Sequence, residues 1–316
     1  ANHSSGIQFL NNVITQSGSG IHTDNSGDGG GVADLIQGNS VDCTGVSGAY
    51  GIWTFVPYLA PTVNNNIVTN CDVGLSAWGQ GAAVTTQFTD NTAIGDGSVG
   101  SVGVYITTDL IGWGYTDVSV LFSGNIITGF ETGIYLTADP QSWNTYPYTA
   151  QTIDATFELN QIYDNTYGLD KGTSGIYITD VERNWWGAAS GPGPVGFGTG
   201  DTIAAGLDYS PWCTVPDCSS LSINPLSPSG TLTAWDKSFQ WEGTPGAAWY
   251  ILEVYNSSDV RLTSKWISAP TYCSGTSCSY IITPDLPLAN GDYYWRIRDV
   301  TGGVYGYWSG ITRFTL

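Results

Sequence analysis

The chain of 316 residues carries 8 Lys and Arg against 27 Asp and Glu, a formal net charge of −19. This charge excludes a nucleic-acid backbone as partner, because phosphates are bound by cations that displace counterions, and it argues against anionic membrane surfaces. Aromatic residues (13%) outnumber charged ones (11%), and 42 glycines follow no collagen-like period, so the composition indicates a folded, β-rich chain. The length suggests two domains.

Several features predict an extracellular location. Methionine is absent, including an initiator, so we expect the chain to start after a cleavage, most simply of a signal peptide. No apolar run reaches the length of about 18 residues that a transmembrane helix needs. Six cysteines in such a chain indicate an oxidising compartment, and sequons begin at Asn2 and Asn256. We therefore expect a secreted or cell-surface glycoprotein that does not insert into a membrane.

The first two thirds of the chain is an internal repeat. Seven asparagines recur at spacings of 27, 27, 25, 34, 35 and 24 residues, namely Asn12, Asn39, Asn66, Asn91, Asn125, Asn160 and Asn184. Three residues before each lies an apolar residue, two residues after most lies another, and a Gly-aliphatic pair such as Gly103-Val104 follows. Only the Asn91 unit departs from this pattern: Ala93 occupies the position two residues after the asparagine, and the larger Ile94 comes one residue later. Such short units bury a core only by stacking, as in a solenoid.

Short alternating stretches join these landmarks and show no helical periodicity. Val104-Tyr105-Ile106 predicts a strand with Val104 and Ile106 inside and Tyr105 outside. Strands separated by Gly and Asn turns predict a parallel β-helix of about seven rungs. We expect each Asn to occupy a corner that tolerates left-handed backbone, and its amide to bond the next Asn about 4.8 Å away.

These repeats resemble those of right-handed parallel β-helix proteins of the pectate-lyase-like superfamily. The segments Asn184-Trp-Trp-Gly-Ala-Ala-Ser-Gly-Pro192 and Gly206-Leu-Asp-Tyr-Ser-Pro-Trp212 resemble the end of such domains in secreted bacterial and archaeal surface proteins. The resemblance covers residues 1–212 and implies the fold. It leaves function open, because the superfamily contains lyases, hydrolases, adhesins and structural proteins.

Composition changes sharply after residue 212. Residues 1–212 hold two cations and 19 acidic residues, a net of −17, whereas residues 219–316 have a net of −1. The Pro-rich stretch 213–230 predicts a linker, and 231–316 predicts a β-sandwich of short strands. Phe239-Gln-Trp241 and Asn290-Gly-Asp-Tyr-Tyr-Trp-Arg296 resemble fibronectin type III or Ig-like modules of bacterial extracellular proteins. The expected fold class is therefore all-β.

Six cysteines allow 15 pairings, and the expected fold selects among them. Cys43 and Cys71 fall at nearly the same place on adjacent rungs, at Asn39 + 4 and Asn66 + 5. Two other pairs flank short segments, the linker and a hairpin-like loop. The predicted disulfides are Cys43–Cys71, Cys213–Cys218 and Cys273–Cys278.

Catalytic candidates are few. Asp109 and Asp139 each lie six residues after the glycine of a Gly-aliphatic pair, and two carboxylates about 5 Å apart suit a retaining glycosidase; the alternative is that both close strands at solvated turns. Polyuronate lyases of this fold use an Arg or Lys base with Ca²⁺, but residues 1–212 hold only Lys171 and Arg183, and we expect Arg183 to pair with Glu182 or Asp180. The chain's two histidines, His3 and His22, are both near the first rung.

One segment resembles the start of a calcium loop. Asp24, Ser26 and Asp28 place oxygen atoms at positions 1, 3 and 5, with Gly29 at 6. The closing Glu is missing, because position 12 is Leu35. A weak Ca²⁺ site and a plain Gly-rich turn are both open, and no cofactor is required.

Aromatic residues cluster after the Gly-aliphatic strands. We expect them to leave the β-helix at one edge and to stack in rung order, where they contact sugars or another subunit or pack on the protein's own flank. They are Trp53, Tyr58, Trp78, Trp113, Tyr115, Trp143, Tyr146 and Tyr148.

The first rung lacks a sequence that predicts a cap. Phe9, Ile14 and Ile21 form its apolar layer, and the end of a β-helix exposes strand edges. We expect another copy to cover it, and a contact that does not close into a ring builds a filament. The prediction is a secreted, non-catalytic structural protein, a filament or surface-layer subunit associated with itself and with glycans. The alternative is a carbohydrate-active enzyme or carbohydrate-binding protein acting on extracellular polysaccharide.

Overall fold

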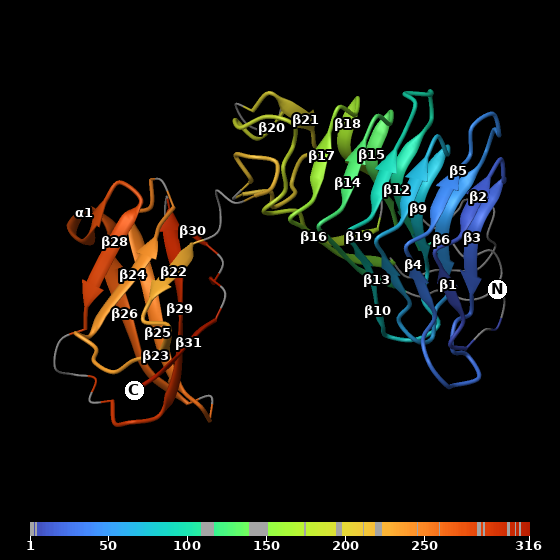
Figure 1. Cartoon of the computed structure of the whole chain (residues 1–316). Coiled ribbons are helices and arrows are strands. Elements are labelled where there is room, and N and C mark those ends of the chain that lie inside the picture. The colour runs from blue at the N-terminus through green and yellow to red at the C-terminus, as the bar shows by residue number, and fades with distance from the viewer. Residues whose placement is uncertain are drawn as a thin grey trace. The chain divides into compact units, whose positions relative to one another are not determined.

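The computed structural model describes the chain except residues 1, 2, 4, 109–116, 139–150, 174, 194–197, 211, 219–222, 245, 259, 283–285, 287, 302–303, 307 and 310. The chain divides into two compact units, residues 1–218 and 219–316. The first is a parallel β-helix and the second consists mainly of antiparallel sheets (Figure 1). Residues 213–230, the expected linker, are divided between the two units.

Three parallel sheets form the β-helix. Sheet I contains β1 (Gln8–Leu10), β4 (Leu35–Gln37), β7 (Thr62–Asn64), β10 (Thr85–Thr89), β13 (Val118–Ser123), β16 (Thr152–Glu158) and β19 (Ile176–Asp180). Sheet II contains β2 (Val13–Thr15), β5 (Ser40–Asp42), β8 (Ile67–Thr69), β11 (Thr92–Ile94), β14 (Ile126–Thr128) and β17 (Gln161–Tyr163). Sheet III contains β3 (Ser19–Asp24), β6 (Tyr50–Phe55), β9 (Val73–Trp78), β12 (Val102–Thr107), β15 (Thr132–Thr137) and β18 (Tyr167–Lys171). The pair β20 (Pro192–Gly193) and β21 (Gly200–Thr202) follows.

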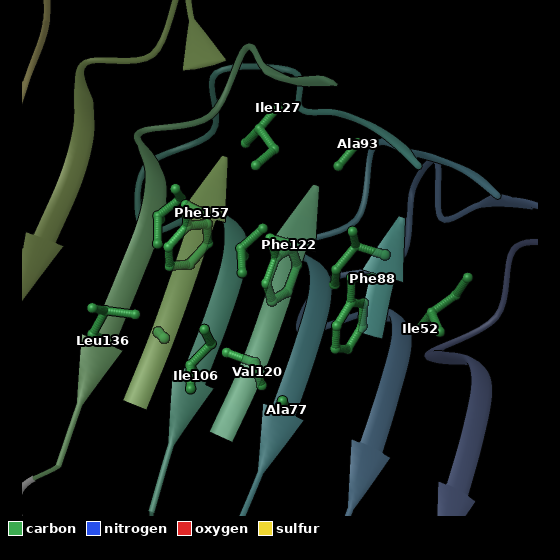
Figure 2. Close-up of a cluster of buried hydrophobic side chains, with 14 of the residues drawn as sticks. Ile52, Ala77, Phe88, Ala93, Ile106, Val120, Phe122, Ile127, Leu136 and Phe157 are labelled. Atoms are coloured by element: carbon green, nitrogen blue, oxygen red, sulfur yellow. The ribbon is translucent and has the colours of Figure 1, made fainter. Parts of the chain in front are cut away.

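Inward-facing side chains of successive rungs stack into columns. Phe88, Phe122 and Phe157 occupy equivalent positions in sheet I and are fully buried. Figure 2 shows these rings side by side in a row across neighbouring strands. Their centroids are 4.3 and 5.0 Å apart. Ala93 pairs in register with Val68 and Ile127, so the Asn91 unit has no irregularity. The Phe130 ring lies close by, against Gly74 and Gly103.

A ladder of buried asparagines fixes the height of each rung. Six times, the side-chain Nδ2 of one asparagine donates to Oδ1 of the next at 2.8–3.0 Å, and its backbone N–H donates to the same oxygen. The same Nδ2 atoms also donate to backbone carbonyls of the preceding rung, as from Asn91 to Val63. The expected ladder is therefore present from Asn12 to Asn184.

The left-handed residue of this corner is the one before each asparagine, which corrects the expectation that the asparagine itself adopts this conformation. The seven residues with positive φ are Asn11, Gly38, Asn65, Asp90, Gly124, Leu159 and Arg183. The glycines of the Gly-aliphatic pairs lie in or beside sheet III strands. A Cβ on Gly51 would lie 2.5 Å from the carbonyl oxygen of Gly74. Close approach of stacked rungs, rather than a turn, requires these glycines.

The far end of the β-helix is closed by its own chain. Trp186 is fully buried, and the N–H of Cys213 donates to the carbonyl of Asn184. The predicted disulfides Cys43–Cys71, Cys213–Cys218 and Cys273–Cys278 are all present. The 213–218 segment thus packs on the last rung as a cap.

The C-terminal unit has two sheets around a second core. Sheet IV contains β22 (Asn224–Ser227), β24 (Ser238–Glu242), β28 (Ser277–Ile281) and β27 (Cys273–Ser274). Sheet V contains β23 (Gly230–Thr231), β31 (Thr312–Thr315), β29 (Asp292–Thr301), β25 (Trp249–Asn256) and β26 (Arg261–Ser268), and β30 (Val304–Tyr305) pairs with β29. The short helix α1 (Ala269–Tyr272) follows β26. Trp241, Trp295 and Phe239 are buried between them. No helix among the described residues is long and apolar enough to span a membrane.

Replacing Phe122 by Ala is expected to lower the free energy of unfolding by about 3–5 kcal/mol, because it opens a cavity between two stacked rings. Leu121, the preceding residue of the same strand, faces outward, so Leu121→Ala should cost less than about 1 kcal/mol. Urea unfolding of both variants measures the difference, and equal losses would contradict the register.

Replacing Asn91 by Ala should cost about 3 kcal/mol or more. The change leaves the backbone N–H and Nδ2 of Asn66 and the carbonyl of Val63 without these partners, and each buried orphan costs about 1–3 kcal/mol. Asn12 is exposed at the end of the ladder, so Asn12→Ala should cost about 1 kcal/mol or less. Equal thermal stability of the two variants would show that the ladder does not hold the rungs.

Candidate functional site

The outer face of sheet III carries aromatic side chains at stacked positions. The strand register aligns five outward residues in successive rungs, which are His22, Trp53, Ser76, Tyr105 and Tyr135. Two residues further along the strands, Phe55 and Trp78 form a second row. Because neighbouring strands lie about 4.8 Å apart, side chains of adjacent rungs are brought within ring-contact distance.

These rings form one continuous cluster. Trp53 stacks on His22 with centroids 3.9 Å apart, and it meets Trp78 edge-on at 5.6 Å. Trp78 in turn contacts Tyr105 at 5.7 Å, and Tyr105 stacks on Tyr135 at 6.0 Å. Ser76, between Trp53 and Tyr105 in the row, is fully buried. The contacts of Trp78 therefore carry the cluster across this serine.

The titratable rings at one end of the cluster, His22 and Tyr50, are uncharged at pH 7. Burial lowers the pKa of His22 to about 4, so its ring is uncharged at pH 7. Burial raises the pKa of the Tyr50 hydroxyl, whose ring lies 5.4 Å from that of Trp53. The Trp53 indole N–H donates to the Ser19 hydroxyl at 3.1 Å. The rings are half-buried, which leaves part of each ring accessible at the surface. We call the set Tyr50, His22, Trp53, Phe55, Trp78, Tyr105 and Tyr135 the aromatic face.

The predicted aromatic residues divide into two that lie in strands, one that follows a strand, and five that lie outside the described residues. Trp53 and Trp78 belong to strands β6 and β9 rather than to loops after them. Tyr58 follows β6, and its ring lies against Gly81. Trp113, Tyr115, Trp143, Tyr146 and Tyr148 lie outside the described residues.

The sequence carried a signal for the members of the aromatic face that the prediction missed. His22, Trp53, Ser76, Tyr105 and Tyr135 each directly follow a Gly-aliphatic pair. Since the aliphatic residue points inward, the next residue must point outward. Aligning the repeats on this pair alone reveals the row, including His22 and Tyr135.

The candidate calcium residues have other contacts. Asp28 pairs with the His3 ring, which lowers the pKa of the carboxyl. The Ser26 hydroxyl is buried and accepts the Asp34 N–H at 3.3 Å. Asp24 has one buried oxygen without a hydrogen-bond partner, and burial raises its pKa. Among the described residues, no group of three or more His, Cys, Asp or Glu side chains is arranged to hold a metal ion.

The two cations of the β-helix have partners of their own. Arg183 lies 3.8 Å from Glu158 on the preceding rung, a residue that the sequence did not indicate. The Lys171 ammonium lies 5.0 Å from the centre of the Tyr177 ring. The carboxylates Asp109 and Asp139 lie outside the described residues.

The sequons and the first rung complete the predicted sites. Asn2 lies outside the described residues, whereas the Asn256 side-chain oxygen accepts the N–H groups of Ser258 and Val260 in the turn after β25. In the first rung, Phe9 and Ile14 pack partly buried against the core. Ile21 is already buried, so it has little apolar surface to offer another molecule.

Comparison with known proteins adds no relationship: no family model matches the chain, and no curated protein is significantly similar to it. The geometry alone must therefore support a function.

The neutral His22 ring predicts a pH-dependent stability. Its pKa is about 4 in the folded chain and about 6.5 when unfolded, so the unfolded chain binds more protons in this window. This contribution is fully present above pH 6.5 and is lost as the pH falls toward 4. In urea unfolding at pH 7, 5.5 and 4, His22→Phe should lose less stability on acidification than the natural chain. His3→Gln, the control, should show no such gain, because the His3 pKa is raised by Asp28. Identical pH dependence of His22→Phe and the natural chain would contradict a buried neutral ring.

Proposed function

We propose that this chain is a secreted, non-catalytic structural or surface protein that contacts neutral glycans through the aromatic face and associates with copies of itself. The observation that carries the glycan contact is the continuous ring cluster from His22 to Tyr135 over five rungs. Trp and Tyr offer large apolar rings with a polar edge, which suits the apolar faces and hydroxyl rims of sugars.

The chemistry of the aromatic face favours neutral over anionic sugars. His22 is uncharged at pH 7, and no Lys or Arg occurs among the outward residues of strands β3 to β15. A carboxylated polymer would meet a domain with a net charge of −17 over residues 1–212. Repulsion on that scale disfavours an acidic polysaccharide.

The extracellular part of the proposal is supported by the disulfides. All six cysteines are paired, and such bonds persist mainly in oxidising compartments. We assign the β-helix to the pectate-lyase-like superfamily and the C-terminal unit to fibronectin type III-like modules as part of the same proposal. The turn position of Asn256 is compatible with a glycan on its side chain.

Self-association is the second part of the proposal. The first-rung strands β1, β2 and β3 are the edge strands of their sheets, and Val13 of β2 is 79% exposed. Open strand edges with apolar side chains favour pairing with another chain. Phe9 and Ile14 contribute to this end, whereas Val13 replaces the buried Ile21 as the exposed apolar group.

Affinity electrophoresis tests the glycan contact, with gels that contain neutral β-glucans or polygalacturonate. We expect retardation by at least one neutral polymer and none by polygalacturonate. Trp53→Ala should weaken that retention about tenfold or more, because the ring lies at the centre of the cluster. Tyr272→Ala, at an exposed tyrosine of the other unit that lies outside both aromatic surfaces, is the matched control and should leave retention unchanged.

Two outcomes would contradict this function. Retention that survives Trp53→Ala would move the glycan contact off the aromatic face. Shortening of the polymers during incubation, abolished by Asp109→Asn or Asp139→Asn, would establish the carbohydrate-active enzyme instead.

A further inference from the structure

A second aromatic surface lies on the outer face of sheet V. Trp249, Trp266 and Tyr305 are 44%, 54% and 50% exposed. The Trp266 ring contacts both of the others, with centroids 6.4 Å from Trp249 and 6.0 Å from Tyr305. Trp249 and Trp266 come from the paired strands β25 and β26, and Tyr305 from β30, which pairs with β29. The buried Ile251 pairs in register with Trp266. Three exposed rings joined through Trp266 form an apolar patch, and such exposed patches often mark binding sites.

The cations beside these rings differ in how they are compensated. Arg296 and Arg261 both bind the buried carboxylate of Glu253, at 2.8 Å. The Arg298 guanidinium instead lies 4.5 and 4.6 Å from the ring centres of Tyr305 and Trp308, and its Nε is buried without a hydrogen-bond partner. No carboxylate among the described residues pairs with Arg298. We call Trp249, Trp266, Tyr305 and Arg298 the aromatic–arginine patch.

This composition favours a protein partner with negative charge. Trp, Tyr and Arg are the residues enriched at the centres of protein interfaces. An unpaired guanidinium between rings attracts a carboxylate, which the rings would shield from water. The β-helix, with its net charge of −17 over residues 1–212, supplies carboxylates in every copy of the chain.

One surface of the β-helix complements the patch, because it offers both exposed apolar side chains and a negative charge. On the outer face of sheet I, Ile176 and Ile178 of strand β19 are 46% and 59% exposed. Asp154 pairs in register with Ile178 on the neighbouring strand. Its carboxylate is exposed and has no ion pair or hydrogen bond with the described residues. We call Ile176, Ile178 and Asp154 the isoleucine–aspartate patch.

We propose that the aromatic–arginine patch of one copy docks on the isoleucine–aspartate patch of a second copy, with Arg298 pairing with Asp154. The proposal rests on the self-association proposed above and adds to the first-rung edge a second contact between copies. The two patches differ, so the contact is heterologous and repeats from copy to copy. It uses sheet I, which leaves the aromatic face of sheet III free for glycans.

Sedimentation velocity of the full chain over a range of concentrations tests the proposal, at low salt and in 0.5 M NaCl. We expect concentration-dependent association that weakens in salt, because the Arg298–Asp154 pair is electrostatic. Trp266→Ser should raise the dissociation constant about tenfold or more. Ile281→Ser is its matched control, because Ile281 is an exposed apolar residue of sheet IV.

A charge exchange makes the test specific. Arg298→Glu and Asp154→Arg should each weaken association, and the double variant should restore it, because the pair is then reversed. Asp170→Arg is the control, because it changes an exposed carboxylate of sheet III. It should neither weaken association nor restore it in combination with Arg298→Glu. Thermal unfolding of each variant separates loss of contact from loss of fold.

Four outcomes would overturn the docking. A monomer at every concentration would refute both this contact and self-association in general. Association that survives Trp266→Ser but is lost in Val13→Asp would keep self-association and move it to the first rung. A salt-dependent change independent of concentration would indicate contact within one chain. Retention on polygalacturonate that depends on Trp266 but not Asp154 would assign the patch to an anionic glycan.

Discussion

The buried asparagine ladder is the constraint on which the β-helix depends. Each amide inside the helix must find donors and acceptors, because an unpaired buried polar group costs about 1–3 kcal/mol. The amides find them only when successive rungs lie one strand spacing apart and in the same register, as Asn66, Asn91 and Asn125 do. The long rungs, 34 and 35 residues between asparagines, keep their described strands in register with their neighbours.

A fixed register also determines the surface. Once Ile52, Leu75 and Val104 are aligned inside sheet III, the residues after them must align outside. Aromatic residues at that position in successive rungs therefore line up in a row on the outer face of the sheet, and no loop is needed to bring them together. The stacked glycines have the same origin, since a Cβ on Gly103 would meet the carbonyl oxygen of Gly133 at 2.6 Å. One repeat thus produces both a buried apolar core and an ordered aromatic face.

The sequence was sufficient to predict the β-helix, the ladder and the three disulfides, because all depend on spacings that repeat. The prediction was wrong about which residue of the corner has the left-handed backbone conformation. The left-handed residue is Leu159 or Arg183 as readily as Asn11, so residue type does not reveal the corner. The aromatic face was predicted in part: Trp53 and Trp78 were found, but as loop residues, whereas His22 and Tyr135 require the repeats to be aligned on the Gly-aliphatic pair, which the prediction did not do. Pairing of Arg183 with Glu158 joins different rungs, which sequence proximity to Glu182 could not suggest.

The two aromatic surfaces of the chain need not bind the same partner, because the residues around them differ in charge. Around Trp53 the histidine ring in contact, His22, is kept neutral by burial, so no described residue of the aromatic face offers a positive charge to an anion. Around Trp266 the guanidinium of Arg298 has aromatic contacts but no carboxylate, so an anionic partner gains an interaction that no described residue supplies. Because residues 1–212 hold 19 acidic residues against two cations, other copies of the chain carry that partner in excess. The uneven charge of the chain, which disfavours acidic polymers at the β-helix, thereby favours contact between the C-terminal unit and the β-helix of another copy.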